Sequence, residues 1–259
     1  MNSRMPTKNV SGIYSNEFFA GQVDGSARSA AVVVPLVLSL LPVRSVIDVG
    51  CGVGPWAAAF LANAVPDVWG IDGDYVDRSQ LQIPPDRFLA RDLTKSVRFD
   101  RTFDLAVCLE VAEHLPESRA VGLVADLISV APCILFSAAV PGPTGTNHIN
   151  AQYLPYWIGL FKKQGYEAID PIRPRIWGNE AVKWFYQQNM VVFAASEHPI
   201  LTRGLSKPQS LIHEELYEQV LHQPLTLGML AKGFPGALHR SIRYHLGLRD
   251  GGRTPAADK

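Results

Sequence analysis

The sequence has no excess of charge of either sign. Its 24 lysine and arginine residues balance 24 aspartate and glutamate residues, so the formal net charge at pH 7 is zero. A dedicated nucleic-acid-binding protein draws much of its affinity from neutralising phosphates. The balanced composition therefore argues against nucleic acid as a partner.

Cysteine is scarce. The chain of 259 residues has three, Cys51, Cys108 and Cys133, which are too few and too scattered for a disulfide framework or a zinc knuckle. We expect three reduced core thiols, a pattern that is typical of a cytoplasmic protein.

Long hydrophobic runs are also missing. The most apolar early segment, residues 30–41, is shorter than the roughly 20 residues that span a bilayer. It contains Pro35 and begins too late for a signal peptide. We therefore expect no membrane span, and we interpret this segment as a buried helix.

The composition does favour a globular core. Hydrophobic residues make up 47% of the chain and charged residues 19%, which excludes global disorder. The length is typical of one α/β domain with additional segments.

Short β-branched segments alternate with helical ones, which indicates βαβ units and a parallel sheet covered on both faces. Strands are expected at residues 45–49, 68–71, 87–90, 104–109, 133–137, 166–169 and 190–194. Helices are expected at residues 26–41, 56–64, 118–130, 153–164, 209–221 and 235–246. The predicted fold class is α/β, with a doubly wound, mostly parallel seven-stranded sheet whose ligand lies at the carboxyl ends of the strands.

A glycine-rich segment follows the first strand. Gly50, Gly52 and Gly54 have the spacing G-x-G-x-G, and Asp48 precedes them. Glycines allow a sharp turn and close approach of a ligand to the backbone. The G-x-G-x-x-G of a nicotinamide-dependent oxidoreductase is absent because residue 55 is proline. A carboxylate at Asp48 would repel a pyrophosphate and suits a ligand that carries an ammonium group and a sulfonium.

Two more acids end predicted strands. Asp72 follows the second strand, where a carboxylate can accept both hydroxyls of a ribose. Asp92 follows the third strand, and it can accept a hydrogen bond from an adenine amino group while the backbone N–H of Leu93 donates one. The alternative is that these acids only cap helices.

The segments DVGCGVG, GID, RDL and FDLAVCLEVAEHLP resemble the class I S-adenosylmethionine-dependent methyltransferases, over residues 26–194. The resemblance implies a Rossmann-like methyltransferase fold and S-adenosylmethionine as the cofactor. It places the following residues at the cofactor: Asp48, Gly50, Cys51, Gly52, Gly54, Asp72, Gly73, Asp92, Leu93 and Glu110.

The candidates for acceptor chemistry follow the fourth and fifth strands. Methyl transfer to a hydroxyl requires removal of its proton, and histidine suits that task near neutral pH. Glu113 and His114 follow the fourth strand, and His148 lies in a loop rich in proline and glycine after the fifth. Both histidines also have a structural interpretation, and Asn150 is a candidate helix N-cap. No pair of acids for a metal is evident there, so we expect metal-independent chemistry.

The acceptor is less well defined than the cofactor. The run GTNHINAQYLPYWIGLFKKQGY resembles bacterial methyltransferases that modify glycans or natural products. Aromatic residues further on suit a sugar ring or an aromatic acceptor, or form core. They are Trp177, Trp184, Phe185 and Tyr186.

The predicted organisation has four parts: an N-terminal arm or lid (1–25), a cofactor-binding catalytic domain (26–198), a helical C-terminal extension (199–250) and a disordered tail (251–259). The predicted activity is methyl transfer to a hydroxyl of a small molecule or glycan. Transfer to nitrogen or carbon, and a non-catalytic binding module, are the alternatives. A homodimer is an open option.

Overall fold

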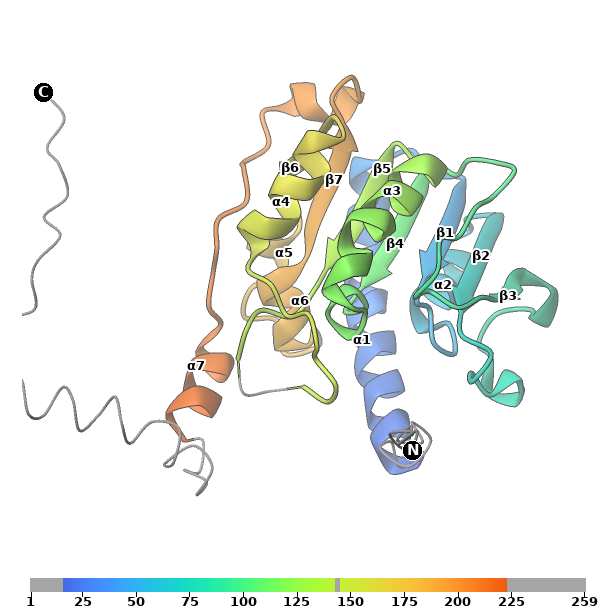
Figure 1. Ribbon diagram of the computed structural model, residues 1–259, viewed down its shortest axis with the longest axis horizontal. Coiled ribbons are helices and arrows are strands. Elements are labelled where there is room, and N and C mark those ends of the chain that lie inside the picture. Colours follow the sequence, from blue (N-terminus) through green and yellow to red (C-terminus); the bar gives the residue numbers. More distant parts are fainter. Residues whose placement is uncertain (1–15, 143–144, 223–259) are drawn as a thin grey trace, which may run out of the picture. The chain divides into compact units, whose positions relative to one another are not determined.

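A computed structural model describes residues 16–142 and 145–222 of the chain. Its strands form one seven-stranded sheet in the order β3-β2-β1-β4-β5-β7-β6 (Figure 1). The strands are β1 (Ser45–Val49), β2 (Asp67–Asp72), β3 (Phe88–Ala90), β4 (Leu105–Leu109), β5 (Cys133–Ser137), β6 (Tyr166–Ile169) and β7 (Val191–Ala195). Neighbouring strands are parallel, except that β7 is antiparallel to β5 and β6. The predicted mostly parallel, doubly wound sheet is confirmed.

Each strand begins and ends within one residue of its predicted bounds. The accuracy has a simple cause, because the central strands are buried on both faces. Every residue of β4 and β5 is buried, so each strand is a short apolar run that contrasts with its surroundings.

Helices cover both faces of the sheet. In Figure 1, α3 and α4 lie in front of the sheet and α1 lies behind it. Two apolar clusters correspond to these two faces. The α-helices are α1 (Asn16–Leu40), α2 (Pro55–Ala62), α3 (Ala120–Val130), α4 (Leu154–Lys163), α5 (Arg173–Ile176), α6 (Trp184–Asn189) and α7 (Glu214–Leu221). The 3₁₀ turns are η2 (Arg78–Gln80), η3 (Pro85–Arg87), η4 (Ala112–His114), η5 (Glu117–Arg119) and η6 (Pro199–Arg203).

The apolar segment of residues 30–41 is largely part of α1 and is buried as predicted. Ala30, Val33, Val34 and Val37 repeat at helical spacing and are at most 1% exposed. The helix begins at Asn16, ten residues before its predicted start, and ends at Leu40. No helix in the described part of the chain has the length and apolarity of a bilayer span.

The segment after β7 is fastened to the sheet domain by backbone hydrogen bonds. Ser206 accepts from the N–H of Asp170 at 2.8 Å, and the N–H of His213 donates to Gln188 Oε1 at 2.7 Å. The helix predicted at 209–221 begins only at Glu214, because the backbone groups of Gln209 and His213 bond to the side chains of Arg173 and Gln188. Within the described residues, the compact unit that contains the sheet ends at Tyr217.

Several predicted features lie outside the described residues. These are most of the N-terminal arm, the helix at 235–246 and the tail at 251–259.

A buried ion pair joins β6, α5 and the following segment. Arg173 is 1% exposed, and its guanidinium donates twice to Asp170 Oδ2, at 2.8 Å and 3.0 Å. It also donates to the carbonyls of Gln188 and Gln209. A buried charge is tolerated only when it is paired and hydrogen-bonded in this way.

We predict that Arg173→Leu lowers the free energy of unfolding by about 3–5 kcal/mol, because it leaves Asp170 buried without its partner. Arg78→Leu is the control, since the Arg78–Asp74 pair is exposed and such pairs contribute at most about 1 kcal/mol. Denaturant unfolding measures both values. Equal destabilisation by the two substitutions would contradict the role of the buried pair.

Candidate active site

The predicted site residues follow strands that end at one edge of the sheet. β1 pairs in parallel with β2 on one side and with β4 on the other. The direction in which successive strands are added to the sheet reverses between β1 and β4. The loops that follow these two strands therefore lead away from each other. Crevices at such positions are where open α/β sheets bind ligands.

The glycine loop lies between β1 and α2. Gly50, Gly52 and Gly54 have φ values of 80°, 56° and 91°, in the left-handed region that favours glycine. A Cβ on Gly50 would lie 2.3 Å from Val111, whereas a Cβ on Gly52 would meet no atom within 4 Å. The loop is therefore packed behind Gly50 and open in front of Gly52.

Asp72 connects the loops that follow β1 and β2. Its carboxylate accepts from the backbone N–H of Gly52 at 2.7 Å and of Gly73 at 2.6 Å. The hydroxyl of Tyr75 donates to the same carboxylate. Sequence reasoning missed Tyr75, because nothing in its spacing indicates that the side chain turns back onto Asp72. The contact shows that this carboxylate is placed to accept a hydroxyl donor, which is the chemistry that a ribose requires.

Asp48 is buried beneath the glycine loop without full hydrogen bonding. Its side chain is 3% exposed, and Oδ2 has no partner among the described residues. Burial, and then the charge of Asp72, raises the pKa of Asp48 to about 7. A buried polar atom without a partner is unfavourable, so this oxygen is available to a cationic group that enters the site.

Asp92 and Leu93 follow β3, as predicted, but the Asp92 side chain is engaged locally. Its carboxylate accepts from the backbone N–H and the hydroxyl of Thr94 and pairs with Lys95. These hydrogen bonds lower the pKa of Asp92. Asp92 therefore caps the turn that follows it, which is the alternative role considered from the sequence. An adenine amino group would have to bind the same carboxylate alongside Thr94 and Lys95.

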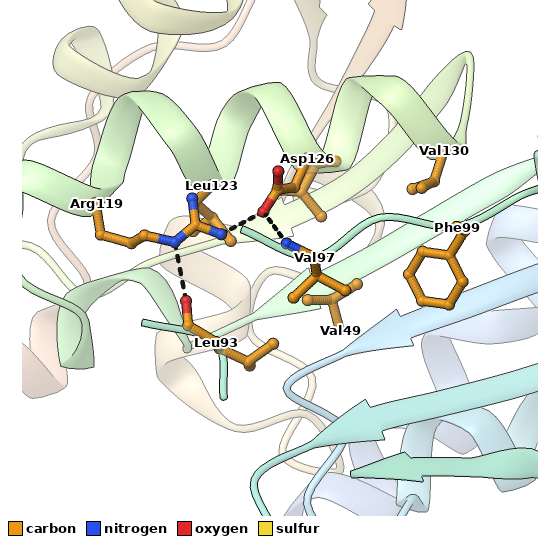
Figure 2. A pocket seen from close by; sticks show the side chains of 9 residues that line it. Val49, Leu93, Val97, Phe99, Arg119, Leu123, Asp126 and Val130 are labelled. Carbon is orange, nitrogen blue, oxygen red and sulfur yellow. Dashed lines mark hydrogen bonds and ion pairs between the residues drawn. The ribbon is translucent and has the colours of Figure 1, made fainter. Parts of the chain in front are cut away.

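The segment after β3 is held onto α3 by an arginine (Figure 2). Nε of Arg119 donates to the carbonyl of Leu93 at 3.0 Å, and the guanidinium also pairs with Asp126. Asp126 accepts from the backbone N–H of Val97 at 2.8 Å. The apolar hollow beneath this network has a volume of about 10 Å³, room for at most one water molecule. The network therefore positions the Leu93 backbone and is not itself a ligand pocket.

Two glutamates follow β4 in a low-dielectric environment. Glu110 has a φ of 55°, and Asn189 Nδ2 donates to its carboxylate at 3.3 Å. Burial raises the pKa of Glu110 to about 7. Burial, together with the charge of Glu110, raises the pKa of Glu113 well above its usual range.

The loop after β5 is fastened onto the turn after β4. The backbone N–H groups of Ile149 and Asn150 both donate to the carbonyl of Glu113 at 2.9 Å. The side chain of Asn150 donates to the carbonyl of Ala112 at 3.4 Å. Asn150 is not the cap of α4, which begins at Leu154 with Tyr153 before it. The Asn-His-Ile-Asn run therefore serves to join two loops.

This fastening brings the two predicted histidines together. The rings of His114 and His148 meet edge to face with centroids 4.9 Å apart. Burial lowers the pKa of His114. Burial, and then the proximity of His114, lowers the pKa of His148 to about 4. Both rings are therefore neutral at pH 7 and offer nitrogen lone pairs.

The comparisons with known proteins agree with this arrangement. Residues 22–127 match a family model described as a methyltransferase domain. No curated protein sequence matches the chain significantly. Magnesium protoporphyrin IX methyltransferase from Synechocystis PCC 6803, solved with bound SAH, is 20% identical with a TM-score of 0.52, over 71% of this chain and 90% of that one. A sugar N-methyltransferase from Streptoalloteichus sp ATCC 53650 is 15% identical with a TM-score of 0.56, over 76% of this chain and 98% of that one.

The sheet order, the glycine loop and the acids at the strand ends together define a Rossmann-like methyltransferase domain. The match to the family model covers residues 22–127, and the solved structures support the same Rossmann-like methyltransferase fold for the chain. S-adenosylmethionine is the cofactor expected from the sequence, and the Synechocystis enzyme has been solved with bound SAH and with bound SAM.

The residues at the edge of the sheet fit that cofactor. An unpartnered carboxyl oxygen of Asp48 suits an ammonium group, and Asp72 already accepts a hydroxyl. The open space before Gly52 leaves room for a ligand against the backbone. The chemistry of the donor set therefore matches the amino-acid and ribose parts of S-adenosylmethionine.

We predict that Gly52→Val weakens S-adenosylmethionine binding by more than about 100-fold, because a side chain fills the space before the loop and strains the backbone. Gly204→Val is the matched control. Gly204 also has a left-handed φ, 66°, with no atom within 4 Å of an added Cβ. Both substitutions place a β-branched residue at a left-handed φ and so strain the backbone equally. Calorimetry should find weak cofactor binding only for Gly52→Val. Equal affinities would contradict a cofactor site at this loop.

We also predict that cofactor affinity depends on the ionisation of Asp48. The carboxyl is neutral below its pKa of about 7 and then cannot pair with an ammonium group. Affinity should fall by up to about tenfold for each pH unit below that value and level off above it. Calorimetric titrations between about pH 5 and about pH 8 test this, with Asp48→Asn as the control. The same pH dependence in Asp48→Asn would assign the effect to another group.

Proposed function

We propose that the protein is an S-adenosylmethionine-dependent methyltransferase that methylates a hydroxyl group of a small molecule or glycan. The observation that carries the proposal is the pairing of His114 and His148, whose rings lie 4.9 Å apart. They belong to loops after β4 and β5, at the edge of the sheet that carries the glycine loop and Asp72. A hydroxyl is the acceptor whose proton must be removed, and neutral imidazoles are the groups suited to assist.

The chain would divide the work between its two groups of loops. Asp48, Gly52 and Asp72, after β1 and β2, would bind the amino-acid and ribose parts of the cofactor and fix its orientation. The cofactor supplies a methyl group on a sulfonium. The loops after β4 and β5 would position the acceptor oxygen in line with that methyl group and exclude water from it.

Transfer to oxygen is favoured over the alternatives by the same residues. A carboxylate or thiolate acceptor needs little help with proton removal, and a half-buried pair of imidazoles would then have no role. A non-catalytic binding module would not require these two histidines at the cofactor edge. The intact glycine loop and the unpartnered oxygen of Asp48 also support a working cofactor site.

The aromatic residues suggested for the acceptor separate into two groups. Tyr186 is buried, and its hydroxyl accepts from Trp56 Nε1 at 3.1 Å, so it belongs to the core. Trp177 is 44% exposed and lies 5.0 Å from the ring of His213. It lines an open hollow of about 370 Å³ with Ile212, Glu214 and Tyr217. Trp184 and Phe185 are half-buried, so Trp177 is the exposed residue of the four and the one on which a sugar ring can stack.

The remaining expectations stay predictions. We take residues 26–198 as the catalytic domain and 199–250 as its helical extension. All three cysteines are free and buried, which supports the expected reducing, cytoplasmic location. A homodimer is untested.

We predict that a screen of hydroxyl compounds and oligosaccharides with isotopically labelled cofactor identifies an acceptor that gains one methyl group on oxygen. His114→Ala and His148→Ala should each lower turnover by about 10²–10⁴-fold, because the hydroxyl proton is no longer removed efficiently. The cofactor dissociation constant should stay nearly constant, since neither histidine belongs to the loops after β1 and β2.

His222→Ala is the control, because His222 is an exposed histidine paired with Glu218. It should retain full turnover. Methylation at nitrogen or carbon, or full activity in both single variants, would contradict the proposal.

A further inference from the structure

Three side chains at the cofactor edge form a cluster that hydrogen bonding among protein groups does not explain. Glu113, His114 and His148 each offer one ligand atom, and these atoms all lie within 4.8 Å of one another. Two residues come from η4 and the third from the loop after β5. The sequence analysis expected metal-independent chemistry because it searched for paired acids, whereas the cluster has one acid and two imidazoles.

Glu113 is the least satisfied residue of the cluster. Its side chain is 0% exposed, and neither carboxyl oxygen has a hydrogen-bond partner among the described residues. The group that interacts with it most strongly by charge is another carboxyl group, that of Glu110. Burying a carboxyl group without partners is strongly unfavourable. No arginine or lysine in the described part of the chain forms an ion pair with it. A cation bound between Glu113 and the histidines would remove this deficit.

Each histidine has a ring nitrogen whose lone pair is available to a metal ion. Nδ1 of His114 lies 3.3 Å from the carbonyl of Asn147, so Nδ1 carries the proton and Nε2 is free to bind a metal. A carbonyl that accepts a hydrogen bond from the other ring nitrogen commonly orients metal-binding histidines. Nδ1 of His148 is buried and has no partner among the described residues.

The backbone holds the ligands near one another. The carbonyl of Glu113 accepts two N–H groups from the loop that carries His148, those of Ile149 and Asn150. Gly145 lets the His148 ring lie close to the chain, since a Cβ there would be 1.9 Å from Cε1 of that ring. The arrangement therefore depends on specific backbone contacts between two loops and not on chance proximity of surface side chains.

We propose that Glu113, His114 and His148 bind one divalent transition-metal ion. Two imidazoles and one carboxylate favour zinc, cobalt, iron or manganese over magnesium or calcium, which prefer sites made only of oxygen. Three protein ligands leave a coordination position open, as in catalytic metal sites.

The cluster needs only a small closure to reach this geometry. Ligands about 2.1 Å from one ion lie about 3–3.5 Å apart, compared with the present limit of 4.8 Å. The proposal therefore requires the His148 and Glu113 side chains to rotate toward the ion while the backbone bonds between the loops stay in place.

When the ion is bound, His114 and His148 hold the metal and no longer act as bases, so the ion takes over the task of promoting proton removal. This part rests on the proposed function. The acceptor hydroxyl would occupy the open position, where the ion makes it more acidic. Its proton passes to solvent. The oxygen then forms a bond to the methyl carbon while the carbon–sulfur bond breaks, and S-adenosylhomocysteine leaves as a neutral thioether.

Metal binding can be tested without any acceptor. The full chain is stripped with a chelator, dialysed, and titrated with Zn²⁺ by calorimetry and with Co²⁺ by visible absorption. We expect one ion per chain, bound more tightly for Zn²⁺ than for Co²⁺ and far more weakly for Mg²⁺. Glu113→Gln, His114→Ala and His148→Ala should each weaken Zn²⁺ binding by about 100-fold or more.

His222→Ala is the matched control, because His222 and Glu218 form an exposed histidine–glutamate pair 3.0 Å apart. It should leave Zn²⁺ affinity unchanged. His148→Asp keeps a ligand atom and should recover most of the affinity that His148→Ala loses, whereas a purely structural loss would not recover. Circular dichroism and thermal unfolding of each variant separate loss of the ion from loss of the fold.

Two outcomes would overturn the metal site: no saturable Zn²⁺ or Co²⁺ binding by the stripped chain, or equal binding by the His114→Ala, His148→Ala and His222→Ala variants. These results are distinct from failure of the proposed function. Methyl transfer to a hydroxyl by fully stripped protein would contradict a role of the metal in proton removal and would support the proposed function. Tight binding of one ion by a protein that methylates no hydroxyl acceptor would support the metal site and contradict the proposed function.

Discussion

Parallel pairing of β1 with both β2 and β4 directs the loops that follow these strands to a single edge of the sheet. The hydrogen bond from the N–H of Gly52 to Asp72 then joins the first two loops. Because strand ends supply backbone N–H groups and acids but few cations, this edge concentrates carboxyl groups in a low-dielectric environment. Burial is the main cause of the raised pKa values of Asp48, Glu110 and Glu113, and a neighbouring carboxylate adds to it at Asp48 and Glu113.

The two halves of the edge are satisfied to different degrees. Around Asp72, protein donors already supply the hydrogen bonds that a ligand would later share, so the loop is shaped before the cofactor arrives. Around Glu113, His114 and His148, acceptors outnumber donors and polar atoms stay unpartnered. Such a deficit lowers stability, and it persists in functional sites because a substrate, cofactor or ion removes it. The deficit is the reason to look for a cation at that position.

The loops after β4 and β5 depend on each other. Neither Glu113 nor His148 is oriented by its own strand, and the bonds from Ile149 and Asn150 to the Glu113 carbonyl bring them together. Loops that follow neighbouring strands of a rigid sheet can in this way hold functional groups with little motion. The network of Arg119 plays a comparable role for the segment after β3, where it fixes the carbonyl of Leu93.

The strands, the two layers of helices and the cofactor loop were predictable from the sequence. Buried strands are contiguous apolar runs, and the spacing of Gly50, Gly52 and Gly54 is a local property of the backbone. The local sequence pattern predicted helix boundaries less well where tertiary contacts determine them. The helix predicted at 209–221 begins at Glu214, because the residues before it bond to Gln188 and Arg173.

The sequence by itself determined the fold class, the acids at the strand ends and the identity of the candidate histidines. Only the tertiary structure decided that Tyr75 turns back onto Asp72, that the Asp92 carboxylate is capped by Thr94 and that His148 meets His114 and Glu113. The last cluster joins residues 34 positions apart, His114 and His148. Contacts of that kind depend on how two loops are placed by the parallel strands beneath them, and no local periodicity records that placement.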